Sequence, residues 1–96
     1  MLRLALSLVI LAAPATAQDT TQLCSVSADI AGAAVSQRAS GQDKPDTVSA
    51  ITGDLQGDTA GFAAAVPHIV DWVWTLPEDQ LTDEVAEAYE AACLAQ

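Results

Sequence analysis

The sequence has very little positive charge. Its 96 residues include three lysines and arginines but thirteen aspartates and glutamates, which gives a formal net charge of −10. A surface this acidic repels the phosphates of nucleic acids and the headgroups of anionic lipids. Neither nucleic acid nor a membrane surface is therefore expected as a partner. The charge favours solubility in a salty medium or, as the alternative, a basic protein partner.

Residues that carry catalysis or bind metals are also scarce. The chain has a single histidine, His68, with no serine or cysteine close to it in the sequence, and it has no glycine-rich phosphate loop. Asp71 follows His68 three residues later. A metal site needs further ligands, and the sequence supplies none at a spacing typical of metal sites. The sequence therefore predicts no enzyme, no metal and no cofactor, and favours a solvated histidine beside a carboxylate.

No apolar run is long enough to cross a membrane as a permanent helix. The run Leu4–Ala13 follows Arg3 and ends just before the small residues ATA, whose last member is Ala17. This three-part layout is typical of a cleaved signal peptide. We expect a leader over residues 1–17 and one domain over residues 18–96, located in the periplasm or secreted. The alternative is a buried N-terminal helix.

Only two cysteines are present, Cys24 and Cys93. In a short exported chain a pair of cysteines most simply forms one disulfide. The chain-entropy model gives about 4 kcal/mol of stabilisation for a loop of this length. Two free thiols or an intermolecular bridge are the alternatives.

Strand signals are absent as well, because β-branched residues never alternate with polar ones over a useful length, whereas alanine is abundant. We therefore predict an all-α fold, a small bundle of three to four short helices closed by one disulfide. The predicted helices begin at the N-caps Asp19, Asp43 and Thr82, and Gly41 is predicted to end the first of them. A further helical region spans 58–76 with a break or kink at Pro67.

The first and last predicted helices have faces that suit each other. The first presents small side chains beside Cys24, which allow a close approach by the helix that carries Cys93. This stripe of small side chains contains Cys24, Ala28, Ala31 and Val35, and the stripe beside it contains Leu23, Ser27, Ile30 and Ala34. The predicted apolar face of the last helix consists of Val85, Ala88, Tyr89, Ala92 and Cys93.

Both tryptophans lie in one predicted helix, VPHIVDWVWTLP. On a helical wheel Trp72 and Trp74 fall on opposite shoulders of a polar stripe that contains His68 and Asp71. One flat contact cannot bury both indoles. Either the helix is central and both are covered, or one indole stays exposed as an anchor for a partner, and the wheel favours Trp74. The candidate partner contact comprises Trp72, Trp74 and Val70.

Two short segments, DKPDTV (43–48) and VPHIV (66–70), resemble the HdeA-like periplasmic acid-stress chaperones. That resemblance implies a helical, disulfide-bonded periplasmic protein that is activated by acid. The chain departs from this family in the late position of Cys93 and in its few lysines. The leading functional prediction is therefore a module that binds a periplasmic protein as an inhibitor, immunity factor or accessory subunit. An acid-activated chaperone is the alternative, and the sequence leaves the oligomeric state open.

Overall fold

The computed structural model describes the backbone of residues 12–96 and the side chains from residue 20 onward. Within this range the chain is an all-α bundle, as predicted, and no helix in it is long and apolar enough to span a bilayer. The elements, in chain order, are α1 (Ala12–Ala39), α2 (Lys44–Asp54), the 3-10 helix η2 (Gly57–Ala65), α3 (Val66–Val73), the 3-10 helix η3 (Glu78–Gln80) and α4 (Glu84–Leu94).

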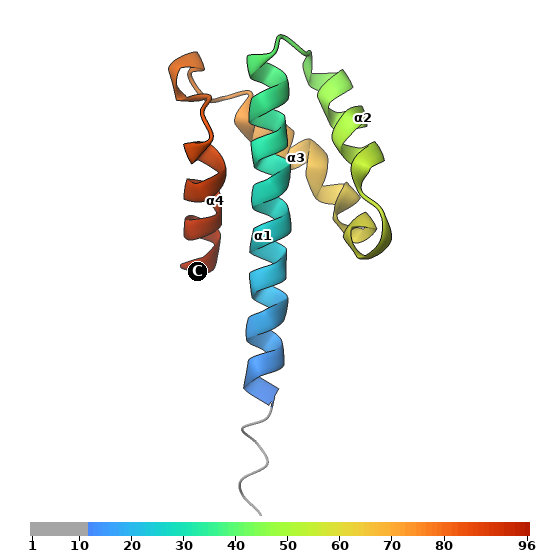
Figure 1. Cartoon of the computed structure of the whole chain (residues 1–96), viewed down its shortest axis with the longest axis vertical. Helices are drawn as coiled ribbons and strands as arrows, with labels where there is room; N and C mark the ends of the chain where they lie inside the picture. The colour runs from blue at the N-terminus through green and yellow to red at the C-terminus, as the bar shows by residue number, and fades with distance from the viewer. Residues whose placement is uncertain (1–11) are drawn as a thin grey trace, which may run out of the picture.

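The long helix α1 is the axis of the bundle. Helix α4 lies along one side of it, α2 lies along the other, and α3 crosses behind it (Figure 1). Helix α1 does not start at the predicted N-cap Asp19, because the alanine-rich residues before that position continue the helix back to Ala12. The predicted cleavage point after Ala17 thus falls within helical backbone. Most of the predicted leader, residues 1–11, lies outside the described residues.

The other end of α1 follows the sequence prediction. Gly41 adopts a φ of 94°, which a residue with a side chain rarely takes. The amide of Gly41 donates to the carbonyl of Arg38, and the amide of Gln42 donates to that of Gln37, each at 3.0 Å. These two bonds form a Schellman motif, which satisfies carbonyls at the end of the helix and turns the chain toward α2.

Helix α2 begins at the predicted cap. The carboxylate of Asp43 accepts a hydrogen bond from the amide of Asp46 at 2.9 Å, and Pro45 occupies the first turn. The hydroxyl of Thr47 is buried and donates to the carbonyl of Asp43 at 2.8 Å. Pro67 causes neither a break nor a kink within a helix, because the chain runs as 3-10 helix up to Ala65 and α3 starts with the proline in its first turn.

The core lies where α1 meets α3, α2 and α4. It contains the predicted small stripe of α1, including Ala28, Ala31 and Val35, together with Ile51 of α2 and the apolar face of α3. Leu23 is an exception: it is 50% exposed rather than buried. It lies next to Cys24, whose disulfide partner Cys93 is close to the C-terminal end of α4.

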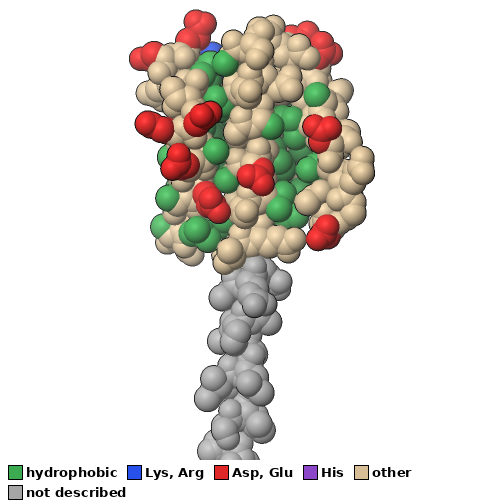
Figure 2. Space-filling model, viewed as in Figure 1, with side chains coloured by type: hydrophobic (Ala, Val, Ile, Leu, Met, Phe, Trp, Pro, Cys, Tyr) green, Lys and Arg blue, Asp and Glu red, His purple; other side chains and the backbone are tan. Residues whose placement is uncertain are grey.

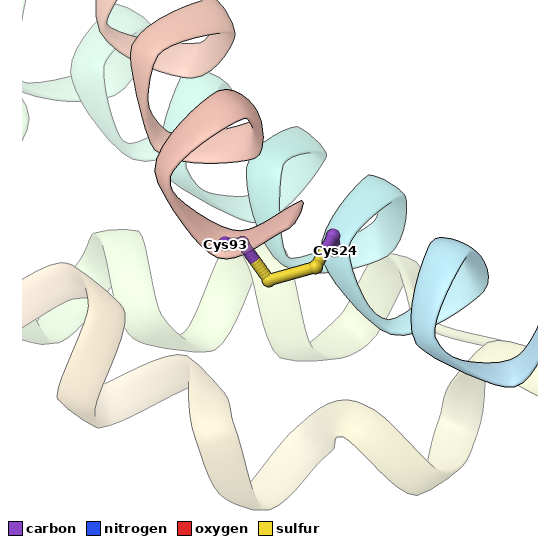
Figure 3. Close-up of a disulfide and its surroundings, with 2 residues drawn as sticks. All are labelled: Cys24 and Cys93. Atoms are coloured by element: carbon purple, nitrogen blue, oxygen red, sulfur yellow. A yellow bond between two sulfur atoms is a disulfide. The ribbon is translucent and has the colours of Figure 1, made fainter. Parts of the chain in front are cut away.

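A disulfide joins Cys24 of α1 to Cys93 of α4, with the two Cα atoms 5.6 Å apart (Figure 3). The predicted pairing is confirmed. The close approach of α1 and α4 that the small residues allow is also present, since a Cβ added at Gly32 would lie 3.2 Å from the Cβ of Ala86. The sulfur bridge and this backbone contact together fix α4 against α1.

Candidate functional site

Helix α3 turns its apolar face into the core. Val66, Val70 and Val73 have no exposed surface and Ile69 is only 6% exposed. This is the face that the spacing of the sequence predicts. Val70 was named as a candidate partner contact, and that prediction is wrong because a side chain sealed in the core offers no surface to a partner.

The two tryptophans differ in their surroundings. Trp74 is half-buried, whereas Trp72 is 40% exposed. The preference for Trp74 as the exposed indole is therefore wrong. Its physical reason is Arg38 of α1, whose guanidinium carbon lies 5.8 Å from the centre of the Trp74 ring and shields it.

Arg38 is held over Trp74 by the end of α3. One of its terminal nitrogens donates to the carbonyl of Val73 at 2.8 Å and to that of Leu76 at 2.7 Å. Val73 is the last residue of α3, and its carbonyl also accepts a hydrogen bond from the amide of Leu76 at 3.1 Å. A cation at a helix C-terminus is favoured by the helix dipole. A helical wheel drawn on α3 alone contains no sign of Arg38, which comes from 35 residues earlier in the chain.

Trp72 packs against Tyr89 of α4. Its ring centre lies 5.5 Å from that of Tyr89, and the two rings are inclined at 57°. This is a tilted aromatic pair of the kind that stabilises packed helices. Trp72 remains 40% exposed in this arrangement, so part of the indole faces solvent while Tyr89 supports it.

Beside this pair the surface is hollowed into what we call the α3–α4 groove. It has a volume of about 450 Å³ and is lined by His68, Ile69, Trp72, Ala88, Tyr89 and Ala92. Ala88 and Ala92 belong to the predicted apolar face of the last helix, and both are exposed. Helix α4 turns Ala86 and Cys93 toward α1, and Ala88 and Ala92 form a wall of the groove. The spacing of four residues places Ala88 and Ala92 on the same face of α4. The sequence contains no signal that shows which helix lies opposite that face.

A second hollow continues from this groove along α4. This acidic hollow has a volume of about 310 Å³ and is lined by Asp79, Gln80, Thr82, Glu84, Val85 and Ala88. Ala88 belongs to both hollows. The predicted N-cap Thr82 lies one residue before the observed N-cap of α4, Asp83, and its hydroxyl accepts a hydrogen bond from the amide of Glu84 at 3.3 Å. An apolar surface therefore passes directly into one that bears two carboxylates.

The predicted pair of His68 and Asp71 does not act as a unit. Asp71 forms an ion pair with Lys44 at 3.1 Å, whereas His68 is exposed at the α3–α4 groove. In the part of the chain with described side chains, no group of three potential metal ligands comes together.

A further hollow lies on the opposite side of α1. It measures about 280 Å³, and Figure 2 shows apolar side chains exposed between α1 and α2. Its lining includes Ile30, Ile51 and Leu55, with Asp29 and Asp54 at its margin. It contains no aromatic side chain, so it lacks the kind of anchor that Trp72 and Tyr89 supply to the α3–α4 groove.

No protein-family model matches the chain, and no curated protein or solved structure gives a match. The class of the protein is thus defined by its own fold and surface. It is a disulfide-closed all-α bundle that presents an indole beside an apolar groove.

Proposed function

We propose that this protein acts by binding another protein through the α3–α4 groove. The observation that carries the proposal is the 40% exposure of Trp72 on a support formed by Tyr89. Tryptophan and tyrosine are the side chains most often found at the energetic centre of protein interfaces. The indole is already held in place, so its immobilisation costs little entropy on binding.

The walls of the groove suit the same role. Ala88 and Ala92 are short, so a partner side chain can reach the backbone of α4 and lie against both aromatic rings. Most of the lining is apolar, and burial of apolar surface drives association. A module of this kind can serve as an inhibitor, an immunity factor or an accessory subunit, and the identity of the partner decides among these roles.

The proposed location is an oxidising compartment, the periplasm or the exterior of the cell. The Cys24–Cys93 disulfide supports it, because such bonds persist outside the reducing cytosol. The expected leader over residues 1–17 supports it independently.

Site-specific crosslinking tests the proposal. A photo-reactive diazirine side chain is placed at Ala92, which lines the groove, or at its exposed neighbour Ala91, which does not. We expect a crosslinked partner, identified by mass spectrometry, only from position 92. Trp72→Ala should abolish that product, since loss of a central tryptophan weakens an interface by about 30-fold or more. Equal products from both positions, or a product that survives Trp72→Ala, would refute the proposal.

A further inference from the structure

The continuity between the α3–α4 groove and the acidic hollow identifies the chemistry of the occupant. We propose that the partner contributes a cationic amphipathic helix, whose apolar side chains enter the groove while a lysine or arginine lies at Asp79 and Glu84. This inference rests on the proposed function and specifies which kind of partner segment the groove takes.

The acidic hollow bears two carboxylates without a neighbouring basic side chain among the described residues. Asp79 and Glu84 are both exposed, and no cation is among the residues that line either hollow. The two cations with described side chains are engaged elsewhere, Arg38 at the end of α3 and Lys44 with Asp71. A basic side chain from outside is therefore the complement that this end of the surface lacks, and it would also be drawn in by the net charge of −10.

The spacing along α4 sets the pattern of the partner. Glu84, Ala88 and Ala92 follow one another at intervals of four residues, so each lies about one turn, or roughly 6 Å along the axis, from the next. A helix packed beside α4 would match this with a basic residue one turn from its first apolar anchor and two turns from its second. The partner helix needs the same spacing of basic and apolar residues whether it runs parallel or antiparallel to α4.

A second copy of this chain fits the surface poorly. Two copies would bring their acidic hollows and their net charges of −10 together without a cation to separate them. An extended peptide fits poorly for another reason, since the hollow lies between helices and has no strand edge that could pair with a peptide backbone in residues 12–96.

Binding of defined peptides to the purified, oxidised protein tests this inference. The probe is an amphipathic helix of about 15 residues with leucines on one face and lysines on the other, and its counterpart carries glutamates in place of the lysines. Isothermal titration should show binding of the lysine peptide only. Ala92→Gln, which fills the groove without a change in charge, should weaken it, whereas Ala91→Gln should not.

A pair of matched double variants then tests whether the carboxylates of the acidic hollow contribute to binding of the lysine peptide. D79N/E84Q removes the two carboxylates of the hollow, and E78Q/E87Q removes two exposed carboxylates from the same elements, η3 and α4, that do not line it. We expect about 5- to 10-fold weaker binding for the first variant and less than about 2-fold for the second. High salt should reduce that difference.

Equal effects of the two double variants would mean non-specific attraction and would overturn the inference, as would equal binding of the glutamate peptide. The proposed function is judged separately by the crosslink at Ala92. If that crosslink persists but its partner segment carries no basic residue near the groove, the inference fails while the proposed function stands.

Discussion

At the scale of single residues, Arg38 has the largest influence on the surface. It is one of only three cations in the chain, and it joins α1 to the end of α3 by two hydrogen bonds while covering Trp74. Hydrogen bonds from a charged donor to carbonyl oxygens are stronger than neutral ones. Arg38 thus determines which of the two indoles remains exposed.

Replacement of Arg38 should therefore destabilise the fold. Arg38→Met keeps the length of the side chain but removes both hydrogen bonds, and we expect a loss of about 2 kcal/mol in the free energy of unfolding, measured by urea denaturation. Lys44→Met removes only the exposed ion pair with Asp71 and should cost less than about 1 kcal/mol. Equal effects of the two substitutions would contradict the role given to Arg38.

At the scale of the elements, helix ends were easier to predict than helix neighbours. Asp43 and Gly41 act at helix ends through bonds to nearby residues, so their sequence context is sufficient, and Thr82 falls within one residue of the N-cap of α4. The spacing of the apolar residues of α3 also predicts its buried face correctly. The exposure of Ala88 and Ala92 and the shielding of Trp74 depend on which helix lies opposite, and no local pattern contains that information.

The contact between α1 and α4 gives a prediction at this scale. Gly32→Leu should cost about 2 kcal/mol or more, because its side chain would occupy the space of Ala86, only 3.2 Å from the first added carbon. Gly53→Ala in α2 is the control. It meets no atom within 4 Å and should instead stabilise the protein by about 0.5–1 kcal/mol through higher helix propensity. Thermal unfolding followed by circular dichroism measures both, and a neutral Gly32→Leu would contradict the close packing.

At the scale of the whole molecule, the bundle relies on a covalent link and a modest core. The largest side chains that are fully buried are valines, a threonine and a cysteine, so each contributes less apolar area than a leucine or phenylalanine. The disulfide closes a sequence separation of 69 residues, which spans most of the described chain. Small domains with limited cores commonly depend on such a link.

Removal of the disulfide should accordingly cost about 4 kcal/mol. The variant C24A/C93A suits the test because Cys24 is fully buried and alanine adds no polar group there. Urea denaturation of the variant and of the oxidised protein gives the difference in the free energy of unfolding. A variant as stable as the oxidised protein would show that the bridge is dispensable.

The response to acid distinguishes the binding module from an acid-activated chaperone. From residue 20 onward every aspartate and glutamate side chain is exposed, except Glu90, which is half-buried. Exposure to a pH of about 3 separates the two hypotheses, because only the chaperone requires acid to expose apolar surface. We expect the helical circular dichroism signal to persist at this pH without binding of a hydrophobic dye. Dye binding together with protection of client proteins would favour the chaperone.

The account depends most directly on the unequal exposure of the two indoles. Acrylamide quenching of fluorescence measures it in Trp72→Phe and Trp74→Phe, each of which retains one tryptophan. A neutral quencher is needed because the acidic surface repels iodide. Trp74→Phe, which keeps Trp72, should be quenched strongly and Trp72→Phe weakly. Two equally shielded indoles would leave the α3–α4 groove without its anchor and would contradict the proposed function.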